Sequence, residues 1–390
     1  MAVIVLDGVG VGAAPDADLY GDAGANSLRH AARAVGGMNA PNLAALGLGC
    51  ITPIQGLPTT ASVPCGYGRL QPQSPGKDTV SGHWELMGIR LAKAFPTYPH
   101  GFPKEIVAEF TRQTGREVLG NKAASGTEIL EELGAEHVRT GKPILYTSAD
   151  SVFQVAAHEA VIPVEELYRI CQIARRILCG EHAVGRVIAR PFLGPVAGQF
   201  QRTAHRRDFP ATPESSSIMD QLKAAGKSVI AVGKIDDIFA GRGITRSNHT
   251  TDNKSSTAAL LELLAENFDG LLFANLIEFD MIYGHRRDPR GYVAALEEFD
   301  RHLPAIQQQL RGDDLVMIVA DHGVDPTAPG TDHTREYVPL LVFGPGVKRT
   351  VDLGIRQSMS DVAATLAEIF GFEPPPVGES FLAALAGEES

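Results

Sequence analysis

Short, almost wholly apolar runs recur along the chain and constrain its fold more than any other feature. Turn-forming residues bound these runs, which is typical of strands buried on both faces of a sheet. Segments with helical spacing of apolar residues alternate with them, and this alternation predicts an α/β sandwich with a largely parallel sheet. Ser360 fits a helix N-cap and Gly371 a helix stop. The apolar runs are 2–6, 228–233, 271–279, 314–320 and 339–344, and the helical segments are 254–268, 292–303 and 360–370.

The middle of the chain has a different character. Prolines gather near residues 96–103 and 210–213, and between them lie the strand-like segments 142–158 and 183–192 and the helical segment 164–178. This pattern predicts an inserted, smaller α+β domain of about 120 residues. We therefore expect a core domain built from residues 1–93 and 214–390, and a cap domain at 94–213.

Composition and charge exclude several classes of protein. The net charge of −11 over 390 residues argues against a nonspecific nucleic-acid binder, which needs a basic surface. No basic leader precedes the first apolar run, and no apolar run approaches the roughly 18 residues of a membrane span. The four cysteines show no Cys-x-x-Cys spacing and are expected to be small buried residues in a reducing cytoplasm. We expect a cytoplasmic protein with neither nucleic acid nor membrane as partner.

Three of the apolar runs end in an acid, and histidines follow two of them. Ligands of open α/β sheets bind at the carboxyl ends of strands, so these acids are expected at one edge if the strands are parallel. Acids crowded there would repel one another unless a divalent cation lay between them. Carboxylates and imidazoles without thiolates fit Mn²⁺, Zn²⁺ or Fe²⁺, and six ligands divide well between two ions, an arrangement that suits phosphoryl transfer. The six residues are Asp7, Asp280, His285, Asp321, His322 and His333.

The alternative for each acid taken alone is a turn residue or a helix N-cap, which is the usual role of a single Asp after a strand. The Gly-x-Gly-x-Gly at 8–12 likewise resembles a dinucleotide-binding loop. Asp7 stands where a diphosphate would approach, and Pro15 interrupts the expected helix, so we interpret these glycines as allowing close backbone approach at a crowded site.

The stretch PGKDTVSGHWELMG at 75–88 places Thr79 just before a helix-like segment. Two roles remain open for this residue. It fits a helix N-cap, and it also fits a nucleophile, because a nearby metal could lower the pKa of its hydroxyl and a helix N-terminus would favour the phosphorylated form.

Together these motifs resemble the alkaline phosphatase superfamily and, within it, the phosphopentomutase family. The resemblance covers nearly the whole chain. GKDT-x-SGHWE at 76–85 and the DHG…TDHTRE segment that begins at Asp321 are its specific parts, whereas the glycine motif alone is not. The supporting segments are 6–17, 76–85, 189–192, 232–245, 277–288 and 320–341.

The resemblance implies a role for each site residue. One Mn²⁺ is expected on Asp280, His285 and His333, and a second on the residues that end the other two strands together with Thr79. Thr79 is then also the phosphothreonine, and the insertion is the cap domain. Within the cap, Asp150 matches a position that reaches substrate, and Arg190 and Arg202 are expected to contact phosphate or sugar. The ligands of the second ion are Asp7, Asp321, His322 and Thr79.

The implied reaction interconverts α-D-ribose 1-phosphate and D-ribose 5-phosphate, and the 2-deoxyribose pair, through a 1,5-bisphosphate. Glucose 1,6-bisphosphate or ribose 1,5-bisphosphate is the expected activator. The alternatives within the superfamily are a metal-dependent phosphatase and a cofactor-independent phosphoglycerate mutase, whose nucleophile is serine. From a different class, a metal-stabilised binding protein would keep the acids and histidines but would give Thr79 no task.

Overall fold

The structure is a computed structural model that describes residues 1–148, 150–196, 198–213 and 215–386. The chain forms two compact units, one of Met1–Lys93 with Pro213–Ser390 and one of Ala94–Thr212. The boundary expected at residue 214, and the last four residues of the expected core domain, lie outside the described residues. Among the described residues, none of the helices combines the length and the apolar character that a membrane crossing requires.

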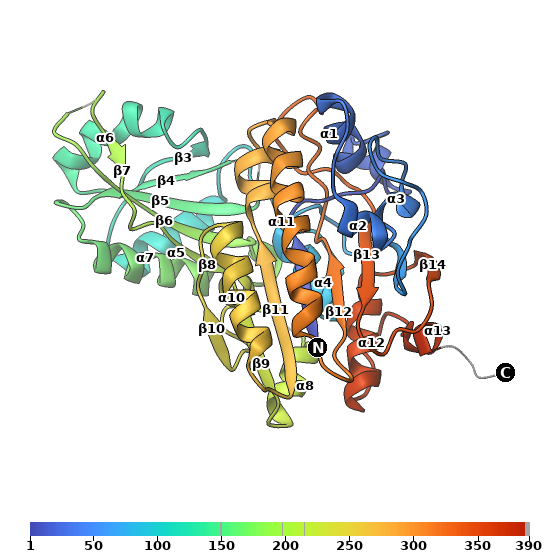
Figure 1. The fold of residues 1–390 in the computed structure, drawn as a ribbon. Coiled ribbons are helices and arrows are strands. Elements are labelled where there is room, and N and C mark those ends of the chain that lie inside the picture. Colours follow the sequence, from blue (N-terminus) through green and yellow to red (C-terminus); the bar gives the residue numbers. More distant parts are fainter. Residues whose placement is uncertain (149, 197, 214, 387–390) are drawn as a thin grey trace. The chain divides into compact units, whose positions relative to one another are not determined.

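Within the described part of the first unit, eight strands form one sheet, drawn in Figure 1. All neighbouring strands are parallel except at β13, which runs antiparallel to β12 and to β2. The predicted α/β class with a mixed, largely parallel sheet is therefore confirmed. In spatial order the strands are β10 (Arg246–Asn248), β9 (Ser228–Val232), β11 (Gly270–Leu276), β1 (Ala2–Leu6), β12 (Val316–Val319), β13 (Val338–Phe343), β2 (Gly66–Leu70) and β14 (Val351–Arg356).

The central strands are apolar except at Asn275 of β11, because both faces of the sheet are covered. Every residue of β1, β11, β12 and β13 is buried. Two groups of helices pack among themselves, and the long α11 and its neighbour α10 stand out in Figure 1. One group is α1 (Ser27–Val35), α2 (Pro41–Ala45), α10 (Asn253–Ala265) and α11 (Pro289–Gln309); the other is α4 (Thr79–Leu86), α8 (Ile218–Ala224), α9 (Ile235–Ile238) and α12 (Asp361–Phe370). Shorter elements are η1 (Ala17–Tyr20), α3 (Leu48–Ile51), η3 (Phe279–Gly284) and α13 (Leu382–Ala386).

Two local expectations are only partly correct. Gly371 ends α12 in the left-handed conformation, as predicted. Ser360 occupies the N-cap position, but its hydroxyl makes no capping bond and instead donates to the carbonyl oxygen of Glu85 at 3.0 Å. Cys65 and Cys171 are buried as expected, whereas Cys50 is half-buried and Cys179 is exposed, and all four are free thiols.

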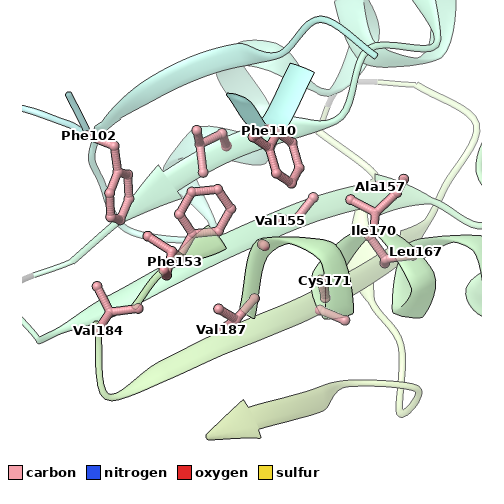
Figure 2. Packing of buried hydrophobic residues seen from close by; sticks show 14 of the residues in the cluster. Phe102, Phe110, Phe153, Val155, Ala157, Leu167, Ile170, Cys171, Val184 and Val187 are labelled. Carbon is pink, nitrogen blue, oxygen red and sulfur yellow. The ribbon is translucent and has the colours of Figure 1, made fainter. Parts of the chain in front are cut away.

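The second unit has its own sheet and its own core. Six strands of its described residues form this sheet, and β4 and β5 are antiparallel neighbours formed by the single strand-like segment predicted at 142–158. Side chains of β5 pack on both faces of this sheet. Phe153 packs with α5 and α7 (Figure 2), whereas Ala156 packs with α6 on the opposite face. The elements are β3 (Leu119–Ala123), β4 (Ile144–Thr147), β5 (Val152–His158), β6 (Arg186–Leu193), β7 (Gln201–Arg202), β8 (Arg207–Pro210), α5 (Lys104–Thr114), α6 (Glu128–Thr140), α7 (Val164–Ile177) and η2 (Gly180–His182).

Candidate metal centre and nucleophile turn

The three strands that end in acids are parallel neighbours in the sheet, in the order β11, β1, β12. Asp7 directly follows β1 and Asp321 lies just beyond β12. The third strand is shorter than predicted: β11 ends at Leu276, and Asp280 lies on the π-helical turn η3 that follows. π-Helical turns are frequent at functional sites, and this one brings Asp280 back to the edge where the other two acids lie.

One glycine shows how crowded this edge is. Gly8 has a φ of +79°, and a Cβ at this position would lie 2.5 Å from Val324 Cγ1 and 3.2 Å from Asp280 Cβ. Both the backbone conformation and the space require glycine. The predicted reason for the glycines after β1, close backbone approach at a crowded site, is therefore confirmed here.

A first group of polar atoms surrounds the Nε2 atom of His322. This atom lies 3.3 Å from Asp7 Oδ1, 3.3 Å from Asp321 Oδ2 and 3.2 Å from Thr79 Oγ1. Two ligands each about 2.1 Å from one ion lie roughly 3 Å apart, so these spacings suit donors to a common cation. Asp7, Asp321 and His322 are all buried.

A second group surrounds Asp280 Oδ1. His333 Nε2 lies 3.1 Å from this oxygen and His285 Nε2 lies 3.3 Å from it, and the two imidazole nitrogens are 3.1 Å apart. Donor atoms of Asp280, His322 and His333 also lie close to one another, so the two groups are adjacent. The imidazoles of His322 and His333 stack with their ring centroids 4.0 Å apart.

The carboxylate oxygens that face the histidine Nε2 atoms have no hydrogen-bond donor among the described residues. Asp7 Oδ1, Asp280 Oδ1 and Asp321 Oδ2 are buried and accept no hydrogen bond from the described residues. The Nδ1 atoms of the three histidines lie at backbone carbonyls, which fixes the lone pair on each Nε2. These contacts are 2.5 Å for His285 to Thr331 O, 3.0 Å for His322 to Gly323 O and 2.7 Å for His333 to Lys77 O. Buried acceptors without partners are costly, and a pair of divalent cations would satisfy all of them.

The acids and histidines at this edge shift one another's pKa values, because several negative charges are buried close together. A bound cation would stabilise these charges. Burial and the neighbouring Asp321 raise the pKa of Asp7. Burial also acts to raise the pKa of Asp321, but His322 and His83 outweigh it and hold that pKa at about 2. The adjacent carboxylate of Asp280 raises the pKa of His285 to about 9 against the effect of burial. Metal binding requires neutral imidazoles and ionised carboxylates, so an ion here would replace protons as the balancing charge.

Thr79 is the first residue of α4 and not its N-cap. The cap is Asp78, whose carboxylate accepts from the backbone N–H groups of Val80 and Ser81 at 3.1 Å each. The Thr79 hydroxyl is therefore free to face His322. A helix N-terminus also favours negative charge, so this position suits a phosphorylated side chain.

His83, one turn further along α4, supports this geometry and was missed as a functional residue. Its Nδ1 lies 2.9 Å from the carbonyl oxygen of Thr79 and 3.1 Å from Asp321 Oδ2, and the ring is fully buried. Asn275 is a second such residue, because its amide donates to Asp7 Oδ2 at 3.0 Å. The His in the SGHWE motif was the only local signal for the first, and no local signal existed for the second.

The three predicted substrate residues all lie in the second unit. Arg190 and Arg202 act electrostatically, with Arg206, on the phenol of Tyr146. Arg190 is half-buried and donates from Nε to Gln154, and burial lowers its pKa to about 10. Asp150 is exposed and lies 3.8 Å from Arg186. The structure thus brings the two predicted arginines into one cationic cluster and pairs Asp150 with a different arginine.

Comparison with known proteins places the chain in a family. The family model of the metalloenzyme superfamily matches residues 1–374. A phosphopentomutase of Herpetosiphon aurantiacus is 62% identical over 385 residues, which are 99% of this chain and 98% of that protein. A phosphopentomutase of Carboxydothermus hydrogenoformans is 56% identical over 381 residues, 98% of each chain. The chain belongs to the metalloenzyme superfamily and, within it, to the phosphopentomutases.

Membership makes the chain an enzyme of the isomerase class, as the sequence motifs predicted. The metal-binding character of the superfamily agrees with the two adjacent donor groups at the sheet edge. Among solved structures, a phosphoglycerate mutase of Leishmania mexicana covers 97% of this chain and 96% of its own at 12% identity and a TM-score of 0.49, a similarity too low to indicate a shared activity.

Proposed function

We propose that this enzyme interconverts α-D-ribose 1-phosphate and D-ribose 5-phosphate, and the 2-deoxyribose pair, with Thr79 as the phosphoryl carrier. The observation that carries the proposal is the position of Thr79 Oγ1, 3.2 Å from His322 Nε2 at a helix N-terminus beside two buried acids. Small pentose phosphates are its substrates, and the cytoplasm is its place of action.

Each half of the reaction exchanges one phosphorus–oxygen bond for another. In the first half, a hydroxyl oxygen of the pentose monophosphate bonds to the phosphorus on Thr79 as the bond from phosphorus to Thr79 Oγ1 breaks. The sugar hydroxyl loses its proton and Thr79 regains one, and the product is a 1,5-bisphosphate. In the second half, Thr79 Oγ1 attacks the other phosphate of the bisphosphate and releases the isomeric monophosphate. A bisphosphate, glucose 1,6-bisphosphate or ribose 1,5-bisphosphate, primes the unphosphorylated enzyme.

The donor atoms support a site for two divalent cations. We assign both as Mn²⁺, one of the ions that carboxylate and imidazole ligands suit, because the resemblance to the phosphopentomutase family implies it. One set is Asp280, His285 and His333, and the other is Asp7, Asp321, His322 and Thr79. When bound, such ions neutralise charge on the transferring phosphoryl group and lower the pKa of a nearby hydroxyl. His322 contacts Thr79 Oγ1. His83 contacts both Asp321 and the carbonyl oxygen of Thr79, and so fixes the position of the first turn of α4 relative to Asp321.

The second unit supplies the contacts to substrate in this proposal. Arg190 and Arg202 carry positive charge that suits a phosphate which is not being transferred, and guanidinium groups bind phosphate with paired N–H donors. Asp150 is assigned to a sugar hydroxyl. Dividing the work in this way makes the first unit responsible for transfer and the second for recognition.

A coupled assay with ribose 1-phosphate tests the proposal. We expect ribose 5-phosphate to form only when Mn²⁺ and a bisphosphate primer are both present. Incubation with glucose 1,6-bisphosphate should add one phosphoryl group, which peptide mass spectrometry should locate on Thr79. Release of inorganic phosphate in place of the isomeric pentose phosphate would contradict the proposal and favour a phosphatase.

A further inference from the structure

The turn at residues 71–78, between β2 and α4, delivers Thr79 to the metal centre but has irregular backbone. Its polar backbone groups bond largely to side chains that come from other parts of the first unit. Those side chains therefore decide where the first residue of α4 lies.

Arg335 donates hydrogen bonds to three backbone carbonyl oxygens of this turn. Its side chain is almost fully buried, and every N–H of its guanidinium has a partner. Nη1 donates to the carbonyl oxygens of Ser74 at 2.7 Å and Gly76 at 2.6 Å, and Nη2 donates to that of Pro72 at 2.9 Å. The carboxylate of Asp16 accepts from Nε and from Nη2.

The N–H groups of the same turn bond to other side chains. The buried carboxylate of Glu85 accepts from the backbone N–H of Gln73 at 2.9 Å and of Ser74 at 2.6 Å. The Tyr20 hydroxyl accepts from the N–H of Gly76 at 3.1 Å, and the Tyr20 ring lies under the Arg335 guanidinium, 5.0 Å from its centre. The guanidinium of Arg335 thus binds the carbonyl groups of the turn, while the carboxylate of Glu85 and the phenol of Tyr20 bind its N–H groups.

The turn is also joined to the metal centre at its far end. His333 Nδ1 lies 2.7 Å from the carbonyl oxygen of Lys77, and His333 is two residues before Arg335 in the chain. One short segment therefore carries both a candidate ligand of the metal centre and the guanidinium that holds the turn. We infer that Arg335 is a positioning residue, which sets the distance between Thr79 and the metal centre without touching the substrate. This inference rests on the proposed role of Thr79.

The physical reason is that phosphoryl transfer depends on alignment. The attacking oxygen must lie in line with the bond that breaks, and a shift of about 1 Å caused by a remote change can cost on the order of 100-fold in rate. Lysine cannot replace arginine here, because an ammonium group has three donors from one point and cannot reach three carbonyls and a carboxylate at once.

The decisive variant is Arg335→Lys, which keeps the positive charge but removes the planar guanidinium group and its five N–H donors. We expect kcat to fall on the order of 100-fold while the KM for ribose 5-phosphate and the bound metal, measured by elemental analysis, stay at wild-type values. Phosphorylation of Thr79 by glucose 1,6-bisphosphate should slow to a similar degree. An unchanged kcat in a variant that only melts at a lower temperature would overturn the inference, as would loss of metal in proportion to loss of kcat.

Arg356 provides a matched control. It has the same three kinds of partner: Asp361 accepts from its Nε at 2.6 Å, the carbonyl oxygen of Glu379 accepts from its Nη2 at 3.0 Å, and the ring of Phe381 lies 5.9 Å from its guanidinium. Arg356→Lys should lower the melting temperature and leave kcat within about twofold, because its partners hold the C-terminal segment and not the turn. Equal losses of kcat in the two variants would contradict a specific role for Arg335.

Two further measurements keep the inference testable if Arg335→Lys folds poorly. Tyr20→Phe removes only the hydroxyl that accepts from Gly76 and should lower kcat several-fold with normal stability and metal content. In Arg335→Ala, added guanidinium ion should restore part of kcat by occupying the vacated space, whereas it should do nothing for Arg356→Ala. No change in kcat for Tyr20→Phe together with no rescue would overturn the inference.

The proposed function is checked in the same experiment on the unaltered chain. If that chain fails to convert pentose phosphates or is not labelled at Thr79, the proposed function is wrong. If it does both, and Arg335→Lys retains wild-type kcat, only the positioning role fails.

Discussion

The sheet edge in the first unit and the arginine cluster in the second both gather charge, but they differ in how that charge is satisfied. At the sheet edge, oxygens of Asp7, Asp280 and Asp321 are buried without hydrogen-bond partners among the described residues. In the second unit, Arg202 is exposed to solvent, and the half-buried Arg190 donates from Nε to Gln154.

The difference shows what each kind of charge cluster can reveal. A buried carboxylate without a partner costs free energy that folding must recover elsewhere, so several together indicate a ligand that supplies the missing charge. An exposed arginine such as Arg202, or a half-buried one with a hydrogen-bond partner such as Arg190, costs little free energy, so their grouping alone indicates no ligand. The proposed metal centre therefore has support from the structure itself, whereas the proposed substrate contacts rest on the family relationship.

The largest loss of activity is expected when Thr79, beside the acids of the sheet edge, is replaced. Thr79→Ala removes the only atom that carries the phosphoryl group in the proposed reaction, so kcat should fall on the order of 10⁴-fold or more. Metal content should remain close to that of wild type, because the other donors are unchanged. Thr79→Ser keeps the oxygen and should retain measurable turnover and a phosphoserine. Normal turnover by Thr79→Ala in the coupled assay would refute the phosphothreonine mechanism.

The next largest loss of activity is expected when the metals, or one of their ligands, are removed. Chelation should abolish activity and Mn²⁺ should restore it best. Asp321→Asn preserves shape but removes a charged ligand, so kcat should fall on the order of 10³-fold and bound metal should decrease. In wild type, Mn²⁺ at 100 times its Kd should add about 2.7 kcal/mol to the free energy of unfolding, and in the variant it should add much less.

Asp313→Asn is the control for that prediction, since this exposed acid lies near the start of β12 and Asp321 lies beyond its end. It should leave activity, bound metal and the stabilisation by Mn²⁺ unchanged. Full activity of chelated wild-type protein, with metal shown to be absent by elemental analysis, would rule out the two-metal proposal.

A smaller effect is expected in the arginine cluster. Arg202→Gln removes a charged contact with phosphate, so kcat/KM for ribose 5-phosphate should fall roughly 10- to 100-fold, with most of the loss in KM. Asp150→Ala should behave similarly. Metal content and priming of Thr79 should stay normal in both. The control Arg169→Gln alters an exposed arginine paired with Glu166 on α7 and should change nothing. Loss of metal in Arg202→Gln would show that the two clusters do not act separately.

The smallest effect on turnover is expected from the core of the second unit. Phe153 lies between the rings of Phe102 and Phe110, with centroids 4.7 Å and 5.3 Å away (Figure 2). Phe153→Ala should lower the free energy of unfolding of this unit by about 3–5 kcal/mol, and Phe153→Leu by less. Below the melting temperature, kcat should change by no more than about twofold. A large loss of metal from Phe153→Ala, measured while the protein is folded, would contradict independent cores.

The strand pattern and the acids that follow it were readable from the sequence because both are local. A strand covered on both faces is apolar at nearly every position, so 2–6, 228–233 and 339–344 could be recognised one at a time. Parallel strands end at one edge, so the acids after them could be expected to meet there. Helix limits were less certain: Asp78, and not Thr79, is the N-cap of α4, because both residue types can fill that position.

Only the tertiary structure could show which partners these residues find. The sequence by itself determined that strands of this chain are followed by acids, and it predicted a smaller inserted unit and a nucleophile in the turn at 75–88. It could not show that β13 runs antiparallel, that η3 returns Asp280 to the site, or that Arg335 bonds to carbonyls some 260 positions earlier in the chain. Local sequence sets what a segment can form because propensity and burial act over a few residues. Contacts between distant segments depend on how the whole sheet is ordered, and no local pattern encodes that order.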